Sequence, residues 1–393
     1  MRVSIMRSMI LLIFLHHLNA EVIKIPLYPT TRVKSMLGHY NALYKWLHRK
    51  WMNVWTDEYT PTSEYLDNFE NFQYYGEVFV GTPPEKFTVQ FDTGSTDAWF
   101  PSRKCWFLDV PCWFFRFYDN SKSSTYQPNG TRFEVNYLMG SFSGFWSMDT
   151  IQINSLVIRN QAFGEVTSIF NTDFISQKYD GIIGMSCRSV SRYGNIPFFP
   201  NIIATTAEMD PVFSFYLSRR NGAPVGGELV LGGVNPEYIE GDFENLSVIY
   251  ENQWAVKMRS MKINGMEFCN ETCVAVIDTG TSLLLGSQKV ADRINSLLGA
   301  TLSHDGDYLL NCDALEKLPP IEFVLRKRKY VFEAKDYVVK DSGWLFSNCL
   351  SPFSGDDNLP DGKWILGDVF MGRFYTVFDF GEKEIRIADA VQA

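Results

Sequence analysis

Apolar and polar residues alternate in short runs along most of the chain beyond about residue 72, a pattern typical of β-strands. Turn residues separate the runs, as in the segment Gly-Thr-Pro-Pro at 81–84. Strands are predicted at residues 74–80, 87–91, 133–137, 228–231, 323–325 and 375–380. Helical patterns are few, and they cover residues 200–207, 289–298 and 368–372. The body of the protein is therefore predicted to be mainly β.

An internal repeat is the most informative feature of the chain. The segment Phe-Asp-Thr-Gly-Ser-Thr at 91–96 recurs as Ile-Asp-Thr-Gly-Thr-Ser at 277–282, each time directly after an apolar strand. Two apolar residues and a glycine follow at matching distances, with Gly184 lying 92 residues after Asp92 and Gly367 lying 89 residues after Asp278. Matching offsets predict two homologous halves related by a pseudo-two-fold axis, which can bring the two aspartates together.

Paired aspartates have a chemistry that a single one lacks. One Asp-Thr-Gly segment also fits a plain tight turn, but two equivalent copies favour a catalytic pair. Close carboxylates cannot both ionise cheaply, so Asp92 and Asp278 are expected to share one proton. The ionised member can then activate a water molecule for attack on a peptide carbonyl, while the protonated member stabilises the carbonyl oxygen. Neighbouring glycine N–H groups and hydroxyls are expected to hold the carboxylates in place: Thr93, Gly94, Ser95, Thr279, Gly280 and Thr281.

Histidine usage and charge exclude several other classes of protein. Only one of the five histidines, His304, lies beyond residue 57, and its surroundings at 303–307 are typical of a turn, which disfavours a histidine-based nucleophilic mechanism. No two-histidine metal site can be built in the body, and we expect neither a metal nor a cofactor. The net charge of −9 combines +2 on residues 1–20, +5 on residues 21–56 and −16 on the remainder. Such an acidic body disfavours binding to nucleic acid.

The N-terminus and the cysteines indicate export. Residues 1–20 have the basic start, apolar run and small-residue end of a signal peptide, and no later stretch is long and apolar enough for a transmembrane anchor. All seven cysteines lie beyond residue 100, where the close spacings 105/112 and 269/273 fit either disulfides or metal pairs, with disulfides favoured in an exported protein. Asn129, Asn245 and Asn270 begin N-glycosylation sequons.

Five segments give the chain a specific resemblance. They are FDTGSTDAWFPS at 91–102, YDGIIG at 179–184, GGELVLGG at 226–233, AVIDTGTS at 275–282 and ILGDVFMGRFYTVFD at 365–379. From about residue 27 to the end, the chain resembles pepsin-family aspartic proteases of the pepsin and cathepsin D type. The resemblance implies a mainly β, bilobal pepsin-like fold with pseudo-two-fold-related lobes at 61–240 and 241–393 and an active-site cleft between them.

The resemblance also implies roles for individual residues. Asp92 and Asp278 would form the catalytic dyad, supported by Ser95 and Thr281. Tyr137 would be the flap tyrosine, with Trp99 as its hydrogen-bond partner. The implied disulfides are Cys105–Cys112, Cys269–Cys273 and Cys312–Cys349, which leaves Cys187 as a free and buried thiol.

Several positions depart from the family pattern. In the flap, Leu138 replaces a glycine and Met139 replaces a hydroxyl residue, although Gly140 remains, so altered specificity is expected more than lost activity. Asp97 stands where asparagine is common. The stretch 105–118 is unusually aromatic, and we favour a small core beneath a disulfide-tied loop over a surface for a partner, lipid or substrate.

The sequence thus predicts an aspartic endopeptidase that acts on protein or peptide substrates as a monomer. Residues 21–60 are expected to be a basic, inhibitory prosegment that is removed at acid pH. The location would be the secretory pathway, with the protein either secreted or lysosomal. The alternative is a catalytically silent homologue that binds peptides in the cleft, although both Asp-Thr-Gly segments are intact.

Overall fold

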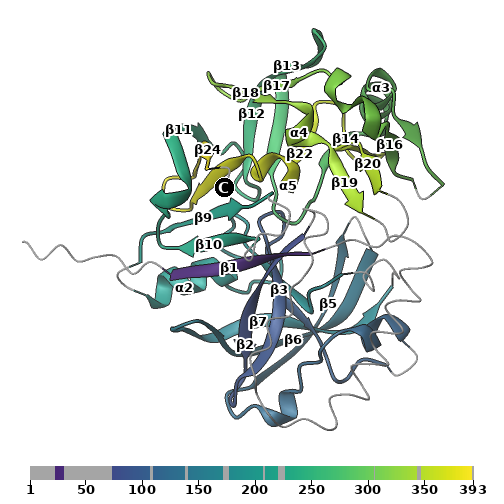
Figure 1. The fold of residues 1–393 in the computed structure, drawn as a ribbon. Coiled ribbons are helices and arrows are strands. Elements are labelled where there is room, and N and C mark those ends of the chain that lie inside the picture. Colours follow the sequence, from purple (N-terminus) through teal and green to yellow (C-terminus); the bar gives the residue numbers. More distant parts are fainter. Residues whose placement is uncertain are drawn as a thin grey trace, which may run out of the picture.

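The computed structural model describes residues 23–30, 73–106, 109–137, 140–170, 177–206, 209–219, 226–304, 306–342 and 347–391. The predicted signal peptide lies outside this part of the chain, as does most of the predicted prosegment. Two β-rich lobes make up the described structure, one formed by the purple-to-teal half of the chain and one by the green-to-yellow half (Figure 1). The prediction of a mainly β, bilobal fold is confirmed.

The first lobe is built from strands that carry apolar residues at alternating or consecutive positions, and these residues form its core. Its strands are β2 (Gln73–Val80), β3 (Glu85–Asp92), β4 (Trp99–Pro101), β5 (Gln127–Tyr137), β6 (Gly140–Ile153), β7 (Leu156–Ile169) and β8 (Gly181–Gly184). They pair in the order β2-β3-β8-β4-β7-β6-β5, so that β5 is an edge strand. The 3-10 helices η1 (Val110–Phe114) and η2 (Asn120–Lys122) and the helix α2 (Phe198–Thr205) complete this half.

The second lobe contains a seven-stranded and a four-stranded sheet. The larger is formed by β12 (Ala255–Ile263), β13 (Met266–Ile277), β14 (Leu284–Ser287), β17 (Ile321–Val324), β18 (Lys329–Phe332), β21 (Phe353–Asp356) and β22 (Lys363–Leu366). The smaller is formed by β15 (Thr301–Leu302), β16 (Tyr308–Leu310), β19 (Val339–Ser342) and β20 (Ser347–Leu350). Its helices are α3 (Gln288–Leu297), η5 (Cys312–Lys317), α4 (Ala334–Tyr337) and α5 (Asp368–Met371).

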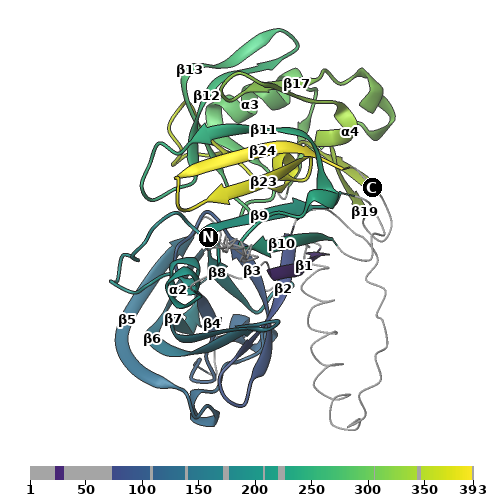
Figure 2. The ribbon, with the colours of Figure 1, turned by 90° about the vertical axis from the view of Figure 1, so that its left-hand side faces the viewer.

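A run of antiparallel strands joins the lobes. It consists of β11 (Ile239–Ser247), β24 (Glu384–Ala390), β23 (Phe374–Asp379), β9 (Val212–Leu217), β10 (Gly227–Leu231) and β1 (Ile23–Thr30), in that order, and η4 (Pro236–Tyr238) leads into β11. Figure 2 shows these strands between the two lobes. The predicted boundary between residues 240 and 241 falls within β11, a strand of this joining run.

The internal repeat corresponds to a repeated strand arrangement. In the first lobe β3 pairs with β8 in parallel, and in the second β13 pairs with β22 in parallel. The register sets Asp92 opposite Gly184 and Ile277 opposite Leu366, which explains why each aspartate is followed at a similar distance by apolar residues and a glycine. A Cβ atom on Gly184 would lie 2.3 Å from the carbonyl carbon of Thr96, so only glycine fits where β8 passes the backbone of Thr96.

The predicted elements recur in the structure with boundaries that shift by a few residues. The aromatic stretch 105–118 agrees with the prediction only in part, because some of its described aromatic side chains are buried and others are exposed. Phe115 and Tyr118 are buried, as expected for a small core, whereas Trp106, Trp113 and Phe117 are 61%, 40% and 37% exposed. His304 lies in a turn between β15 and β16, as predicted, and Ser303 N donates to Asp307 O there.

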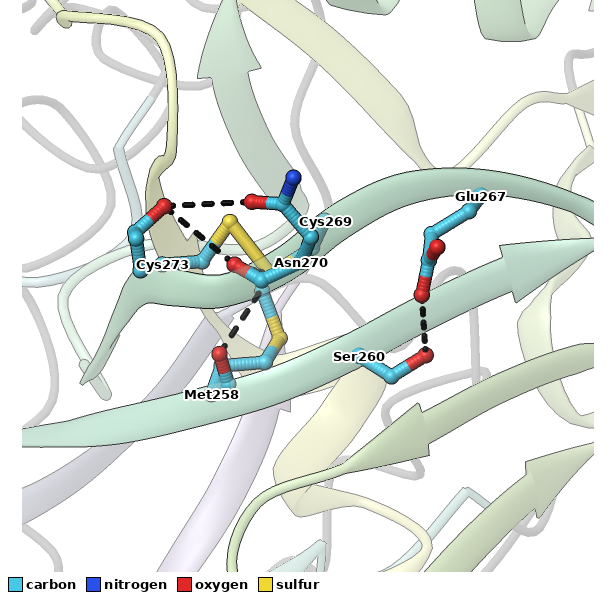
Figure 3. Close-up of a disulfide and its surroundings, with 7 residues drawn as sticks. Met258, Ser260, Glu267, Cys269, Asn270 and Cys273 are labelled. Atoms are coloured by element: carbon cyan, nitrogen blue, oxygen red, sulfur yellow. Dashed lines mark hydrogen bonds between the residues drawn. A yellow bond between two sulfur atoms is a disulfide. The ribbon is translucent and has the colours of Figure 1, made fainter.

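The structure contains the three disulfides that the resemblance implied, Cys105–Cys112, Cys269–Cys273 and Cys312–Cys349, and leaves Cys187 as a buried thiol. The pair Cys269–Cys273 closes a short loop on β13 that contains the sequon at Asn270 (Figure 3). There Thr272 Oγ1 donates to Asn270 Oδ1 at 3.2 Å. The side chains of Asn129, Asn245 and Asn270 are all exposed, as glycosylation requires, and their modification stays a prediction.

No helix in the described part of the chain is both long and apolar enough to cross a bilayer.

Candidate active site

Asp92 and Asp278 occupy equivalent places where the two lobes meet. Asp92 ends β3, and Asp278 directly follows β13. The parallel neighbour of each strand fixes the backbone, because Met185 N donates to Asp92 O at 2.7 Å and Asp278 N donates to Leu366 O at 3.1 Å. Both aspartates are buried, with 5% and 8% of their surface exposed.

Two threonines link the loops that carry these aspartates. Thr93 N donates to Thr279 Oγ1 at 2.9 Å, and Thr279 N donates to Thr93 Oγ1 at 3.0 Å. Each hydroxyl then donates to a backbone carbonyl of the other lobe, Thr93 to Ile277 O at 3.0 Å and Thr279 to Phe91 O at 2.6 Å. Each threonine is thus satisfied by the opposite lobe, and the two aspartates are held in one fixed relative position.

Each carboxylate also receives hydrogen bonds from its own loop. Gly94 N donates to Asp92 Oδ1 and Gly280 N donates to Asp278 Oδ1, both at 2.8 Å. Thr281 Oγ1 donates to Asp278 Oδ2 at 2.8 Å. Ser95 is the equivalent residue of the first lobe; its buried hydroxyl lowers the pKa of Asp92 but makes no hydrogen bond of normal geometry among the described residues. The two halves of the site are therefore similar but not identical.

The glycines of the two motifs have a second role. A Cβ atom on Gly94 would lie 2.5 Å from both carboxylate oxygens of Asp278, and one on Gly280 would lie 2.2 Å from Asp92 Oδ1. Each glycine therefore leaves space for the carboxylate of the opposite lobe. Sequence reasoning assigned these glycines only to turning the backbone toward their own aspartate, because the opposite lobe's approach is a tertiary contact.

Burial of Asp92 raises its pKa above the ordinary range, and the negative charge of Asp278 raises it further. The Gly94 N–H and the Ser95 hydroxyl oppose this rise. Since the dominant causes favour a protonated carboxyl, the pair can retain one shared proton well above the ordinary range of aspartate. This arrangement can supply a general base and a hydrogen-bond donor at the same place.

A third buried carboxyl lies close enough to the pair to interact with both aspartates, and the sequence reasoning did not identify it. Asp368, at the start of α5, is 1% exposed, and neither of its carboxylate oxygens has a hydrogen-bond partner among the described residues. Burial and the charges of Asp278 and Asp92 raise the pKa of Asp368, while the guanidinium of Arg219 opposes the rise. Asp368 directly follows the apolar-apolar-Gly segment at 365–367, but a role was predicted only for that segment and none for the aspartate.

The predicted flap is described only in part. Tyr137 ends β5 and pairs across the hairpin with Gly140 of β6, while Leu138 and Met139 lie outside the described residues. Trp99 lies on β4, with its ring centroid 4.5 Å from that of Phe142 in β6. The hydrogen bond expected between Tyr137 and Trp99 stays a prediction.

The described residues contain one group of three possible metal ligands, Cys105, Asp109 and Cys112. The two cysteines are joined in a disulfide, which removes the thiolates that a metal would need. Asp109 Oδ2 accepts hydrogen bonds from Ser168 Oγ at 2.7 Å and Ile169 N at 3.0 Å. This cluster therefore fastens the aromatic loop to β7.

Comparisons with known proteins agree with this geometry. The family model described as eukaryotic aspartyl protease matches residues 73–390. Cathepsin D of Gallus gallus is 41% identical over 382 residues, which cover 95% of this chain and 96% of the relative. Cathepsin D of Homo sapiens is 39% identical over 346 residues, 84% of each chain, and that of Chionodraco hamatus is 40% identical over 333 residues, again 84% of each chain.

The buried Asp368 predicts that stability falls as pH rises. A carboxyl with a raised pKa in the folded state keeps its proton after the unfolded chain has lost it, so the unfolded state gains relative stability above about pH 4. Substituting Asp368→Asn removes this effect. The free energy of unfolding of the variant, measured in urea between pH 4 and 7, should exceed that of the wild type by an amount that grows by up to about 1.4 kcal/mol per pH unit.

The exposed Asp357 provides a matched control for this measurement. Asp357→Asn should give an unfolding free energy that follows the wild type at every pH. Parallel curves for wild type and Asp368→Asn would show that Asp368 ionises normally and would contradict the prediction.

Proposed function

The chain belongs to the eukaryotic aspartyl protease family, and from this premise we propose that Asp92 and Asp278 hydrolyse peptide bonds by activating a water molecule between them. The protein is an aspartic-type endopeptidase of the cathepsin D-like group. The observation that carries the proposal is the reciprocal Thr93–Thr279 network, which holds two buried carboxylates in equivalent positions.

The proposed reaction follows from the shared proton. The ionised carboxylate of the pair takes a proton from the water, whose oxygen attacks the peptide carbonyl carbon. The protonated carboxyl donates a hydrogen bond to the carbonyl oxygen, where negative charge develops. A shared proton of this kind is general in aspartic proteases. The Gly94 and Gly280 amides keep the carboxylates oriented throughout, since each donates to the oxygen of its own aspartate at 2.8 Å.

Substitution of either aspartate tests the assignment. Asp92→Asn or Asp278→Asn preserves the shape of the side chain but removes the base or the shared proton. We expect kcat/KM toward a denatured protein or fluorogenic peptide to fall about 10²- to 10⁴-fold, with the fold retained.

The control is again Asp357→Asn, which makes the same chemical change on the surface. It should retain the activity of the wild type. Near-normal turnover in a folded Asp92→Asn or Asp278→Asn variant would contradict the dyad. Absence of turnover in the wild type itself would favour the alternative, a catalytically silent homologue that binds peptides in the cleft.

We further propose that the substrate is an extended peptide with apolar side chains on both sides of the scissile bond. The support is the chemistry of the flap sequence, where Leu138 and Met139 add apolar surface at positions that the family fills with a glycine and a hydroxyl residue. We expect these two flap residues to alter which peptide bonds are cleaved rather than whether cleavage occurs, because the aspartate pair itself is unchanged.

This specificity can be measured by mass spectrometry of the products from a proteome-derived peptide library. The wild type should cleave mainly between apolar residues, and Leu138→Gly with Met139→Thr should weaken that preference. A profile dominated by charged residues on both sides of the bond, or one that the double variant leaves unchanged, would contradict the proposal.

The proposed zymogen form finds support in β1. This strand belongs to the predicted prosegment and pairs on both sides, with Ile23–Leu27 along β10 and Tyr28–Thr30 along β2. Ile23 and Ile25 are buried, whereas Lys24 is exposed. The other basic residues of the predicted prosegment lie outside the described residues: Arg32, Lys34, Lys45, Arg49 and Lys50. Because β1 is held by two strands, a cut after residue 56 would not by itself release it.

Acid should activate the protein. As pH falls toward the ordinary carboxylate range near 4, the acidic body loses negative charge and its attraction for the basic prosegment weakens. Residues 21–393 should be inactive at neutral pH. At acid pH activity should appear together with a loss of mass that corresponds to cleavage between residues 57 and 66.

Mass and activity should be followed together, with the Asp278→Asn variant as a matched control that reports whether the protein cuts itself. Because β1 is paired on both sides, the cut prosegment should first co-elute with the body on size exclusion. Full activity at neutral pH with the prosegment still covalently attached would contradict the zymogen proposal.

The protein belongs to the secretory pathway, secreted or lysosomal, in agreement with its relatives and its three disulfides. We propose that it acts as a monomer, since both halves of the aspartate pair come from one chain.

A further inference from the structure

Strand β5, which leads into the predicted flap, has an unusual partner on its free edge. As the last strand of its sheet, β5 pairs only with β6, and Glu134 lies opposite Ser143 in that ladder. On the other edge the hydroxyl of Tyr193 donates to Glu134 O at 2.7 Å and accepts from Glu134 N at 3.3 Å. One side-chain hydroxyl thus takes the place that a neighbouring strand would occupy.

Packing fixes the ring of Tyr193 as well as its hydroxyl. Its centroid lies 5.3 Å from that of Trp146, a buried residue of β6, and Trp146 lies 5.3 Å from Phe133 of β5. Tyr193 therefore contacts both strands of the hairpin. Glu134 precedes Tyr137 by only three residues. This contact therefore lies about 10 Å along the strand from Tyr137, which the resemblance identifies as the flap tyrosine.

The turn at residues 191–195 holds Tyr193 in this position. Ser191 N donates to Asn195 O at 2.8 Å, and Gly194, which has a φ of 82°, donates to Ser191 O at 3.0 Å. The side-chain oxygen Ser191 Oγ accepts from Tyr193 N at 3.1 Å and from Asn195 N at 3.3 Å. Both of its acceptor sites are therefore used, and its single proton remains to be donated elsewhere.

Asp97, five residues beyond Asp92, lies near this turn. Burial raises its pKa to about 6, and the Ser191 hydroxyl and the guanidiniums of Arg188 and Arg192 lower it. The loop that carries Asp97 is bound to the end of β8, since Gly184 N donates to Asp97 O at 3.2 Å. The aspartate loop is thus tied to the segment that leads into the turn at 191–195, and that turn contacts the flap strand through Tyr193.

We propose that Tyr193 is a positioning residue for the flap and that Ser191, through its hydrogen bonds in the turn at 191–195, fixes the position of Tyr193. The inference rests on the proposed function, because it assumes that the hairpin of β5 and β6 closes over a bound peptide. The Tyr193 hydroxyl restrains β5, an edge strand whose backbone is otherwise paired on one side only among the described residues. The restraint would reduce the freedom that the strand loses when substrate binds, and so would lower KM.

Tyr193→Phe tests this, because the variant keeps the ring on Trp146 and removes only the two hydrogen bonds to Glu134. Hydrogen exchange in peptides covering residues 127–145 should become several-fold faster in the variant, with the rest of the chain unchanged. KM for a peptide substrate should rise about 3- to 10-fold while kcat changes less than twofold. Ser191→Ala should produce the same pattern more weakly, since it loosens the turn.

Two matched variants separate positioning from general loss of stability. Tyr337→Phe also removes a buried tyrosine hydroxyl, whose 2.9 Å bond to Pro319 O lies in the other lobe, and Ser189→Ala changes an exposed serine of the same segment. Neither should alter exchange in residues 127–145 or change KM.

Unchanged exchange in Tyr193→Phe would overturn the inference, as would faster exchange accompanied by an unchanged KM. An equal rise of KM in Tyr337→Phe would also overturn it. The exchange measurement needs no turnover, so an inactive wild type would count against the proposed function without deciding the role of Tyr193.

Discussion

Everything at the active site depends on keeping two buried carboxylates side by side. Removing a carboxylate from water costs several kcal/mol, and a second negative charge nearby adds to that cost. The structure offsets the cost with directed donors, namely the Gly94 and Gly280 amides and the Thr281 hydroxyl. It offsets the rest by letting the pair hold a proton. The same compromise that makes burial tolerable therefore provides the acid and the base of the hydrolysis that we propose.

The reciprocal threonines make this compromise stable across a lobe boundary. If each loop were anchored only within its own lobe, small motions of one lobe against the other would change the distance between the carboxylates. Instead, Thr93 and Thr279 each bond to the backbone of the opposite lobe. The lobes are joined again by the strands from β11 to β1. Relative motion is thus resisted both at the site and at the joining sheet.

Acidic surroundings suit this arrangement for a reason that is separate from catalysis. Asp92 and Asp368 both have pKa values raised by burial, and the guanidinium of Arg219 opposes the rise at Asp368 only in part. A fold that buries several carboxyls is most stable where they are protonated, and it loses stability as pH rises toward neutrality. The stability of this protein is therefore expected to favour the same acid pH range in which we propose that it is active.

Much of this could be predicted from the sequence because it is local or repeated. The two Asp-Thr-Gly segments, each followed at a similar distance by an apolar-apolar-Gly segment, predicted two similar lobes, and the alternation of apolar and polar residues predicted the strands. The contacts between lobes could not be predicted in this way, since the space that Gly94 leaves for Asp278 joins residues far apart in the chain. Likewise, nothing in the sequence around Tyr193 indicates its bond to Glu134, 59 residues away.

The pseudo-two-fold symmetry of the dyad does not extend to the residues around it. The position that Asp97 occupies in the first motif is occupied by Leu283 in the second, so only the first lobe has a carboxyl there. In the proposed reaction, a nearly symmetric pair of aspartates suffices for the attack of water. A peptide chain has direction, however, and an asymmetric surface is needed to bind it in one orientation. The restraint on β5 by Tyr193 lies in the first lobe alone, where the asymmetry of recognition can be set without disturbing the symmetry of the chemistry.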